Sequence, residues 1–479
     1  MAHMAGDSDP RTRNPCACTP QKAIGWLGAT AGLILLFLTP PFQVPDEFAH
    51  FYRAYHVSRG HLQAQVKDHR VGDFLPRSLV ATATEPGFNA MPFHPENKMR
   101  LTYLEQAFAL RLDPRDQVFA DFPNTALTSP VPYLPQAAGM ACLTAFRPPP
   151  ILLLYAGRLA NFAVWLLLMA AAVRAAPIGK WLFVMLALMP MSIFQAASLS
   201  PDAFTNGVAF LVTALGLRLG LDSTQAPDGR ATIRFAALAM ALALCKFAYV
   251  FFGLLFFLPA LRWMELTHRR RLFRQGLLVI GLAALAWLAW TLAARGLFLK
   301  YDQYDPLYRD GLALRNGADP DAQLAIVLTA PLTFVTRATA SLVEQRIWEP
   351  LIAHLGWLDV IFPRWFIYAF GAGLAATALT GGTRECFLTR PQKIFVAMIT
   401  GVSILFFCLL SYLQWSPVGW PRVIDLQGRY FIPIAPIALL VLTNRRFALA
   451  PGRWRDAIYV GGLSFSLAVT ILLVASRYY

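Results

Sequence analysis

The stretch Thr39-Pro-Pro-Phe-Gln-Val-Pro-Asp-Glu-Phe-Ala-His-Phe-Tyr-Arg53 lies where an apolar helix ends and two adjacent carboxylates begin. Pro45 suits the first turn of a new helix, because its missing N–H needs no partner there. Asp46 and Glu47 would then lie in that first turn, where the free backbone amides and the helix dipole favour negative charge. We therefore expect a short helix that begins with two ionised carboxylates at a membrane surface.

The same predicted helix carries two further reactive side chains. His50 and Arg53 follow Asp46 at positions i+4 and i+7, so a helix would place all three on one face. A carboxylate pair, an imidazole and a guanidinium form the densest group of such side chains in the sequence. The alternative is an interfacial helix with ordinary surface charges, and this stretch alone does not choose between the two.

The composition defines the broad class of the protein. Hydrophobic residues make up 57% of the 479 positions and charged residues 14%, which indicates a polytopic membrane protein and excludes a soluble enzyme. The net charge of +15 does not point to nucleic acid, because Lys and Arg are scattered through loops between apolar runs. A positive-inside distribution explains the charge more simply.

The six cysteines show neither the spacing of a disulfide framework nor a metal-type CxxC pair, and most lie in or beside apolar segments as small packing residues. Cys16 and Cys18 suggest acylation or metal binding, but residues 1–20 are polar and Pro-rich and fit a disordered cytoplasmic tail better. The apolar run at 22–40 is read as a retained signal anchor. Residues 21–479 are expected to form a single transmembrane domain.

Charge in the short loops predicts the topology. Arg11, Arg13 and Lys22 place the N-terminus in the cytoplasm, and the run His268–Arg271 marks a later cytoplasmic loop. We expect an all-α fold of about eleven transmembrane helices, with long outer loops at about 43–130 and 298–361, the first containing interfacial helices. Residues 130–147 are barely long enough to span, so we read them as a re-entrant or interfacial helix.

On this topology, the polar residues that interrupt apolar segments converge on the outer side of the membrane. Charges at membrane depth cost several kcal/mol unless they are paired or face a wet cavity, so each is a candidate functional residue. Besides the residues already named, the polar residues on this side are Tyr133, Gln136, Asp202, Asn206, Lys246, Gln427, Arg429 and Tyr430.

Two of these residues suggest the kind of ligand. Lys246 and Arg429 together favour an anion, and phosphate is the obvious candidate. Taken singly, Lys246 could extend its ammonium to the interface, and Asp202 could cap the helix after Pro201. All of these residues are expected on the same side of the membrane as Asp46 and Glu47, which favours a shared site.

Several motifs then carry a resemblance. Pro40–Ala54, Ser200–Asn206, Leu355–Asp359 and Gln427–Pro433 resemble a bacterial family of predicted multispanning membrane proteins that is grouped with the GT-C glycosyltransferases. The resemblance implies a GT-C-like fold and a sugar donor linked to polyprenyl phosphate or pyrophosphate. It also implies transfer on the outer face of the membrane, with an acidic residue or pair in the first outer loop as the catalytic element.

Carried to this sequence, the resemblance implies that Asp46 and Glu47 are catalytic. We expect Asp46 to be the base and Glu47 its partner or a metal ligand, with the donor phosphate on Lys246 and Arg429. The supporting residues would be His50, Arg53, Tyr133, Gln136, Asp202, Asn206, Gln427 and Tyr430. We expect no cofactor and no metal site, although two carboxylates could bind a divalent cation.

The sequence thus predicts a multi-pass glycosyltransferase of the bacterial inner (plasma) membrane with its active site on the periplasmic side. Its expected partners are a polyprenyl-phosphate-linked sugar, a glycan or lipid acceptor of the cell envelope, such as a surface polysaccharide, and membrane lipids, but no nucleic acid. A transporter or flippase of lipid-linked saccharides is the main alternative, and a non-catalytic envelope scaffold is the third. The carboxylate pair favours the enzyme, because a flippase does not need a base.

Overall fold

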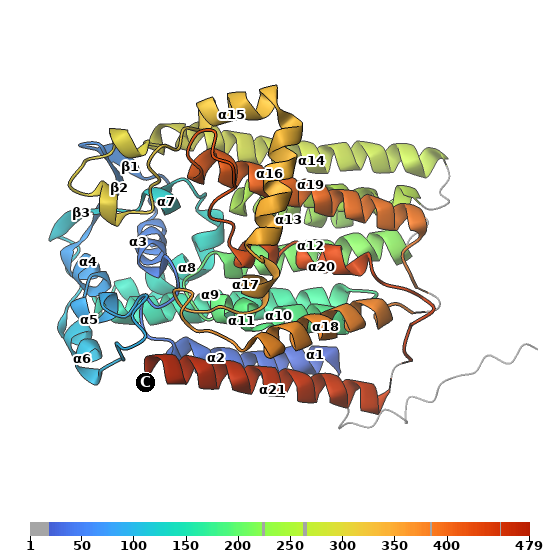
Figure 1. Cartoon of the computed structure of the whole chain (residues 1–479), viewed down its shortest axis with the longest axis horizontal. Coiled ribbons are helices and arrows are strands. Elements are labelled where there is room, and N and C mark those ends of the chain that lie inside the picture. The colour runs from blue at the N-terminus through green and yellow to red at the C-terminus, as the bar shows by residue number, and fades with distance from the viewer. Residues whose placement is uncertain (1–18, 223–225, 262–265, 384–385, 451) are drawn as a thin grey trace, which may run out of the picture.

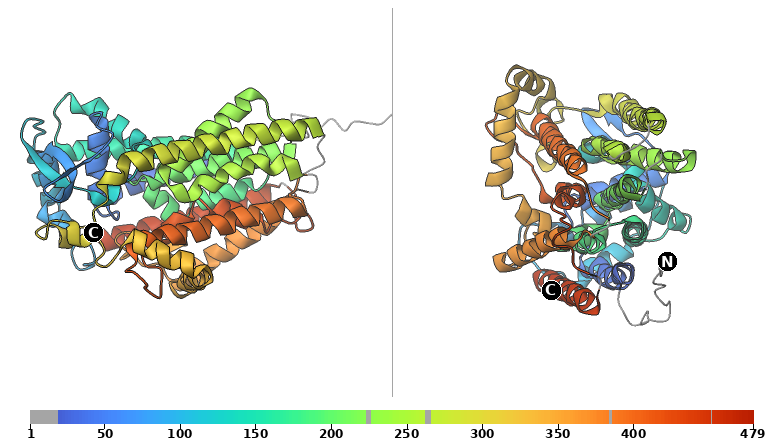
Figure 2. Two further views of the ribbon diagram at one scale, coloured as in Figure 1. Left: turned by 90° about the horizontal axis from the view of Figure 1, so that it is seen from above. Right: turned by 90° about the vertical axis from the view of Figure 1, so that its right-hand side faces the viewer.

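The structure, a computed structural model, describes residues 19–222, 226–261, 266–383, 386–450 and 452–479. Long helices run side by side along the longest axis of the molecule (Figures 1 and 2). Within these residues, six helical segments are long and apolar enough to cross a membrane. They are Pro20–Leu38 (α1 Pro20–Ala23, η2 Ile24–Gly28 and α2 Ala29–Leu38), α9 (Pro150–Ala175), α12 (Asp202–Asp222), α14 (Leu266–Ala294), α19 (Arg390–Trp415) and α21 (Arg453–Tyr478).

The remaining helices of the bundle are shorter than a full span. By length and apolarity they do not qualify as membrane spans, so the described residues do not reach the predicted count of about eleven. They are α10 (Lys180–Ala187), α11 (Pro190–Ala196), α13 (Gly229–Cys245), the 3₁₀ helix η4 (Phe247–Leu261), α18 (Arg364–Thr380) and α20 (Ala435–Leu440). The described part of the chain therefore has six candidate spans, or seven if one bent helix pair is a single span.

The first long loop forms a cap at one end of the bundle (Figure 1). Its helix α3 spans Glu47–Ser58, so the predicted short helix after Pro45 is confirmed. Residues 130–147 contain an eleven-residue helix, α8, which is too short to cross a membrane and packs on α3 and α9. The helices of this loop are α3, α4 (Arg77–Ala83), α5 (Pro86–Asn89), α6 (Leu101–Ala109), α7 (Pro123–Ala126), η3 (Val131–Tyr133) and α8 (Leu134–Thr144).

The cap also contains a small antiparallel sheet in the order β1-β2-β3, which the all-α expectation missed. The strands are β1 (Gln65–Lys67), β2 (Arg70–Pro76) and β3 (Gln117–Asp121). Val66 pairs with Val71 across the first pair, and Phe74 pairs with Phe119 across the second. Because β3 lies some forty residues after β2 in the chain, local pattern does not reveal its pairing.

The second long loop, between α14 and α18, is not extended chain either. Helices α15 (Pro320–Thr329) and α16 (Pro331–Glu344) meet at a bend of 110°, and α16 crosses the direction of the long helices (Figure 1). Short elements complete the loop: η5 (Arg295–Leu297), η6 (Tyr301–Gln303), η7 (Arg309–Gly311) and α17 (Trp348–Ile352). A final short turn, η8 (Gly428–Phe431), packs on α17.

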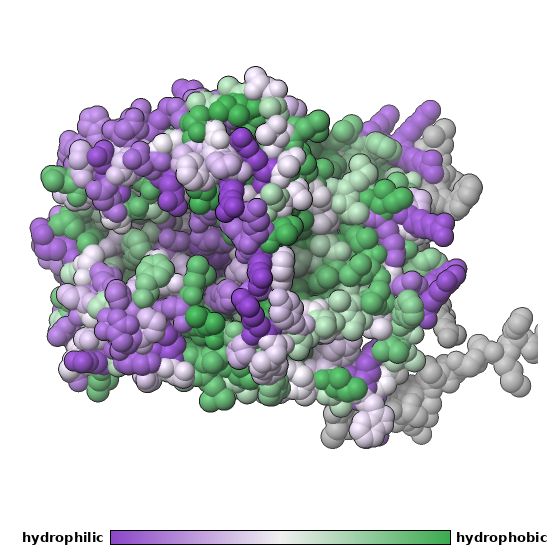
Figure 3. All heavy atoms as spheres, in the orientation of Figure 1, coloured by the Kyte–Doolittle hydropathy of each residue, from purple (hydrophilic) through white to green (hydrophobic). Residues whose placement is uncertain are grey.

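The surface fits a protein that lies in a membrane. Figure 3 shows apolar side chains over the middle of the bundle, with hydrophilic side chains over the cap and at the opposite rim. Large apolar side chains such as Leu277, Leu278 and Ile394 are more than half exposed on α14 and α19. Residues 1–20 were predicted to be a disordered tail. Residues 1–18 of this tail lie outside the described residues, and the first helical segment begins at Pro20.

Candidate functional site

Arg429 stands at the centre of a group of charges at the capped end of the bundle. Its Nη2 donates to Asp46 Oδ2 at 3.1 Å, and its Nε lies 3.7 Å from Asp202 Oδ2. The same Nη2 lies 3.1 Å from the hydroxyl of Tyr430. Lys246 lies beside them, with its Nζ 3.3 Å from the centre of the Tyr430 ring. We call Asp46, Asp202, Lys246, Arg429 and Tyr430 the Arg429 cluster.

Four separate elements bring this cluster together. Asp46 precedes α3, Asp202 begins α12, Lys246 joins α13 to η4, and Arg429 and Tyr430 lie in η8. The Asp46–Arg429 contact joins residues 383 positions apart. The sequence predicted all five residues as members of a site, and the structure brings them together.

Arg429 is buried, the other four members of the cluster are partly exposed, and the cluster keeps free bonding capacity. The Arg429 side chain is 5% exposed, whereas the Asp46 side chain is 25% exposed. Arg429 Nη1 has no hydrogen-bond partner in the described part of the chain. Among those same residues, the Lys246 ammonium faces the rings of Tyr430 and Phe407 rather than a carboxylate. Two cations with unused N–H groups beside a partly open carboxylate can accommodate an anion.

Strained backbone marks two of the four segments that carry the cluster. Asp46 has φ 63° and Phe42, four residues earlier, also has φ 63°, both in the left-handed region. Asp425, close to Arg429 in the chain, has φ 60°. Non-glycine residues are held in this region only where the surrounding structure demands it, and such positions gather at functional sites.

Asp425 lies near the cluster and was not among the residues predicted from the sequence. Burial raises the pKa of the Asp425 carboxyl, although a hydrogen bond from Gln427 and the nearby Arg429 oppose this shift. Gln427 Nε2 donates to Asp425 Oδ1 at 2.9 Å, which gives the predicted supporting residue Gln427 a definite partner. A carboxylate two residues before the Gln427–Pro433 motif was the signal available in the sequence.

His50 and Tyr133 form a buried pair next to Asp46. His50 Nδ1 lies 2.9 Å from the Tyr133 hydroxyl, and burial lowers the pKa of His50 to about 4 despite the neighbouring Asp46. A neutral His50 therefore shares a hydrogen bond with the Tyr133 hydroxyl at neutral pH, and the tautomer of the imidazole sets which of the two groups donates. The sequence predicted both as supporting residues, and the structure places them beside Asp46.

Glu47 is placed differently from the sequence prediction. Its carboxylate forms a fully buried ion pair with Arg158 of α9 instead of an ion pair with Arg429. Backbone N–H groups of Phe42 and Leu199 also donate to it, so its oxygens are occupied. The expected role of Glu47 as a partner of Asp46 or a metal ligand does not fit this arrangement. Arg158 was missed, although a lone arginine within an apolar helix was a visible signal.

Arg53 also lies outside the cluster. Its Nη1 contacts His56 Nδ1 at 2.9 Å, and its Nη2 donates to the carbonyl oxygens of Leu62 and Thr128. Arg53 thus ties α3 to the backbone at Leu62 and Thr128, two turns along the helix from Asp46. The helical spacing was predicted, but the contacts of the side chain were not.

The two remaining predicted residues are buried amides on neighbouring elements. Gln136 Nε2 donates to the carbonyl oxygen of Leu199 at 3.2 Å and supports the turn before Asp202. Asn206 lies one turn after Asp202 on α12, and both polar atoms of its amide lack a protein partner within the described residues.

A second group of titratable side chains lies in the cap. His56 Nε2 and His61 Nδ1 lie 2.8 and 3.2 Å from Asp73 Oδ2, and the three could hold a metal ion by distance. However, Arg53 donates to His56 Nδ1, so the proton of neutral His56 lies on Nε2 and faces Asp73. Burial opposes ionisation of Asp73, but hydrogen bonds from His56, Gln65 and His61 outweigh it and hold the pKa of Asp73 well below its usual range. This pattern fits a structural hydrogen-bond chain.

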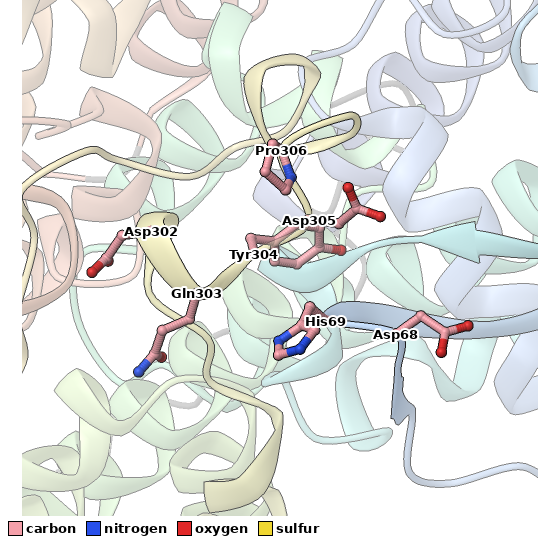
Figure 4. A pocket seen from close by; sticks show the side chains of 7 residues that line it. All are labelled: Asp68, His69, Asp302, Gln303, Tyr304, Asp305 and Pro306. Carbon is pink, nitrogen blue, oxygen red and sulfur yellow. The ribbon is translucent and has the colours of Figure 1, made fainter.

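A shallow hollow of about 370 Å³ lies between the β1–β2 turn and residues 302–306 (Figure 4). Asp68 and His69 line it from the turn, and Tyr304 lines it from the second segment. The N–H of Asp305 donates to the carbonyl oxygen of His69 at 3.0 Å, which ties the second loop to the sheet. None of the predicted site residues lines this hollow.

The helical bundle, its apolar belt and the buried charges at one end define a multi-pass membrane protein. The chain belongs to the family described as predicted membrane protein (DUF2142), whose model matches residues 30–438. The match includes every member of the Arg429 cluster. No curated protein and no solved structure matches the chain significantly. The expectation that the chain belongs to a family of predicted membrane proteins is therefore confirmed.

Proposed function

We propose that this chain is a membrane glycosyltransferase of the GT-C class. It would transfer a sugar from a polyprenyl-phosphate donor to a glycan or lipid acceptor of the cell envelope, at the periplasmic face of the bacterial inner membrane. The observation that carries the proposal is the contact of partly exposed Asp46 with Arg429, beside a second cation on Lys246. A base next to two cations at one end of a membrane bundle suits sugar transfer from a lipid phosphate.

The reaction assigns a part to three of the charges in the Arg429 cluster. The oxygen of the acceptor hydroxyl attacks the anomeric carbon of the sugar, the bond from that carbon to the phosphate oxygen breaks, and Asp46 takes the hydroxyl proton. The negative charge left on the lipid phosphate is balanced by Arg429 and Lys246. In this scheme the donor phosphate would take the place of Asp46 on the Arg429 guanidinium and release the carboxylate to act as a base.

The proposed topology has eleven passes. The shorter helices α10–α11, α13, η4, α18 and α20 would complete the six long segments, because they lie along the same axis in Figure 1. The end of the bundle opposite the Arg429 cluster carries loops rich in Lys and Arg, including Arg445 and Arg446 between α20 and α21. By the positive-inside rule this end would be cytoplasmic, which leaves Asp46 on the outer side.

The test is a transfer assay in lipid vesicles with polyprenyl-phosphate sugars labelled in the sugar and acceptors from membrane extracts. Asp46→Asn is the informative variant, because Asn tolerates the left-handed backbone that Asp46 adopts, so the substitution removes the basic carboxylate without adding backbone strain. We expect its transfer rate to fall by about 10²- to 10⁴-fold. Asp116→Asn is the matched control, since Asp116 is exposed and pairs with Arg77 in the cap.

Two outcomes would contradict the proposal. Full transfer by Asp46→Asn would remove Asp46 as the base. Labelled donor that crosses the bilayer without transfer, at the same rate in wild type and Asp46→Asn, would end the enzyme proposal and favour a flippase of lipid-linked saccharides.

A further inference from the structure

The Glu47 carboxylate is saturated with hydrogen bonds. Oε1 accepts from Arg158 Nε at 2.9 Å and from the N–H of Leu199 at 3.0 Å. Oε2 accepts from Arg158 Nη2 at 2.5 Å and from the N–H of Phe42 at 2.9 Å. Both ionised side chains are fully buried. Four donors on one carboxylate leave it no site for a substrate or a cation.

Arg158 is equally committed. Its Nη1 donates to the carbonyl oxygens of Leu36 and Thr39, at 3.0 and 2.8 Å. Its Nη2 donates to the carbonyl oxygen of Pro40 at 3.1 Å, besides its bond to Glu47. The guanidinium therefore holds the end of α2 and the turn that leads to Asp46. The rigid fork of arginine suits such a node, because its donors have fixed directions.

Through these bonds the ion pair reaches both carboxylates that face Arg429. Asp46 directly precedes Glu47, so fixing the Glu47 side chain fixes the backbone next to Asp46. Leu199, which donates to Glu47, lies three residues before Asp202. Asn161, one turn from Arg158 on α9, donates to the carbonyl oxygens on both sides of Leu199, at 2.8 and 2.9 Å. Helix α9 thus anchors the two segments that present Asp46 and Asp202.

We propose that the buried Glu47–Arg158 ion pair is a positioning device that holds Asp46 and Asp202 at the separation at which both face Arg429. Glu47 and Arg158 touch no substrate and act only through the two aspartates. For catalysis, this inference rests on the proposed function, because positioned carboxylates matter to the reaction only if Asp46 is its base. The positioning itself is a property of the folded chain and can be measured without any activity.

The structural test is a double-mutant cycle between Asp46→Asn and Arg429→Gln, read from thermal unfolding of the purified full chain in detergent. The coupling between the two substitutions reports their ion pair. It is measured in the wild-type background and in the paired variant Glu47→Gln with Arg158→Gln, which removes both buried charges and keeps polar side chains. The control background is Arg70→Gln with Asp121→Asn. These two substitutions remove a largely buried ion pair of the cap that belongs to neither the Asp46 segment nor the Asp202 segment.

We expect the coupling between Asp46 and Arg429 to persist in the control background and to be lost in the paired variant. Coupling of wild-type size in the paired variant would overturn the proposal. If the paired variant does not fold, Arg158→Lys replaces it, because lysine keeps the charge but not the fork geometry. In Arg158→Lys the coupling must fall to less than half of its wild-type size, and an unchanged coupling there overturns the proposal too.

Kinetics test the consequence for the reaction. In the paired variant, kcat should fall about 100-fold, as expected for a reacting group displaced by about 1 Å, while the KM for the donor stays within about threefold. A rise in KM with unchanged kcat would contradict positioning of the base. A wild-type protein without transfer activity would remove the proposed function, but the coupling result would stand on its own.

Discussion

At the scale of single residues, backbone strain and charge occur at the same places. Phe42 is a bulky side chain at φ 63°, a conformation that costs of the order of 1–3 kcal/mol. Its N–H donates to Glu47 and its carbonyl oxygen accepts from Trp357 Nε1 at 3.1 Å. These bonds hold the chain where it turns toward Asp46, so the strain belongs to the geometry that presents the carboxylate.

His50 gives the stability of this protein a defined pH dependence. Burial lowers its pKa to about 4 in the folded chain, against about 6.5 when unfolded. Between these values the unfolded chain binds a proton that the folded chain does not, so stability rises with pH across this window and is lost as pH falls through it. The contribution is at most about 3 kcal/mol.

The measurement is the thermal unfolding midpoint in detergent between pH 7 and pH 4.5, for wild type and His50→Gln. The midpoint of wild type should fall more steeply toward pH 4.5 than that of His50→Gln. The comparison isolates His50, because burial also lowers the pKa of His56 and both proteins retain that residue. Parallel curves would show that His50 is not the titrating group.

At the scale of secondary-structure elements, a short turn accounts for the Leu355–Asp359 motif of the sequence. Leu355 and Val360 form an antiparallel bridge that closes the turn containing Trp357. From this turn Trp357 donates to the carbonyl oxygen of Phe42, and the hydroxyl of Tyr478 on α21 contacts the carbonyl oxygen of Gln43 at 3.3 Å. The Leu355–Asp359 motif therefore braces the segment before Asp46 through Trp357.

The sheet of the cap depends on one glycine. A Cβ at Gly72 would lie 1.8 Å from the carbonyl oxygen of Ala120, so β2 and β3 approach closely only because residue 72 has no side chain. Gly72→Ala should therefore force the strands apart and destabilise the cap by about 1–3 kcal/mol. Gly296→Ala is the control, because nothing lies within 4 Å of a Cβ there.

Limited proteolysis between β1 and β3, together with the unfolding midpoint, measures this effect. Faster cleavage of Gly72→Ala than of wild type and Gly296→Ala is expected, because separated strands expose the backbone of the cap. Equal resistance in all three proteins would mean that the sheet absorbs the added methyl group by a shift of its strands.

At the scale of the whole molecule, the two ends of the bundle should face opposite sides of the membrane. Single cysteines placed at Asp116, beside β3, and at Arg446, between α20 and α21, mark the two ends, and both native side chains are exposed. In a background without the native cysteines, a membrane-impermeant maleimide should label Asp116→Cys in intact spheroplasts and Arg446→Cys only after lysis. The reverse pattern would place the Arg429 cluster on the cytoplasmic side and contradict the proposed topology.

The sequence by itself determined the class of the protein and most members of the site. Apolar runs of span length are local properties, and the cost of charge in lipid marks Asp202, Lys246 and Arg429 wherever their partners lie. Helix α3 was likewise predictable from Pro45 and the carboxylates that follow it. The cap sheet escaped notice, because its outer strand pairs with a segment distant in the chain.

Only the tertiary structure decided which charge pairs with which. Glu47 and its neighbour Asp46 have the same local signal, yet Glu47 pairs with Arg158, 111 positions away, and Asp46 with Arg429, 383 positions away. Arg53 has the helical spacing of a site residue but contacts His56 instead. Ion pairs between distant segments depend on how the helices pack, and a change of a few ångströms in that packing exchanges partners without altering any local pattern.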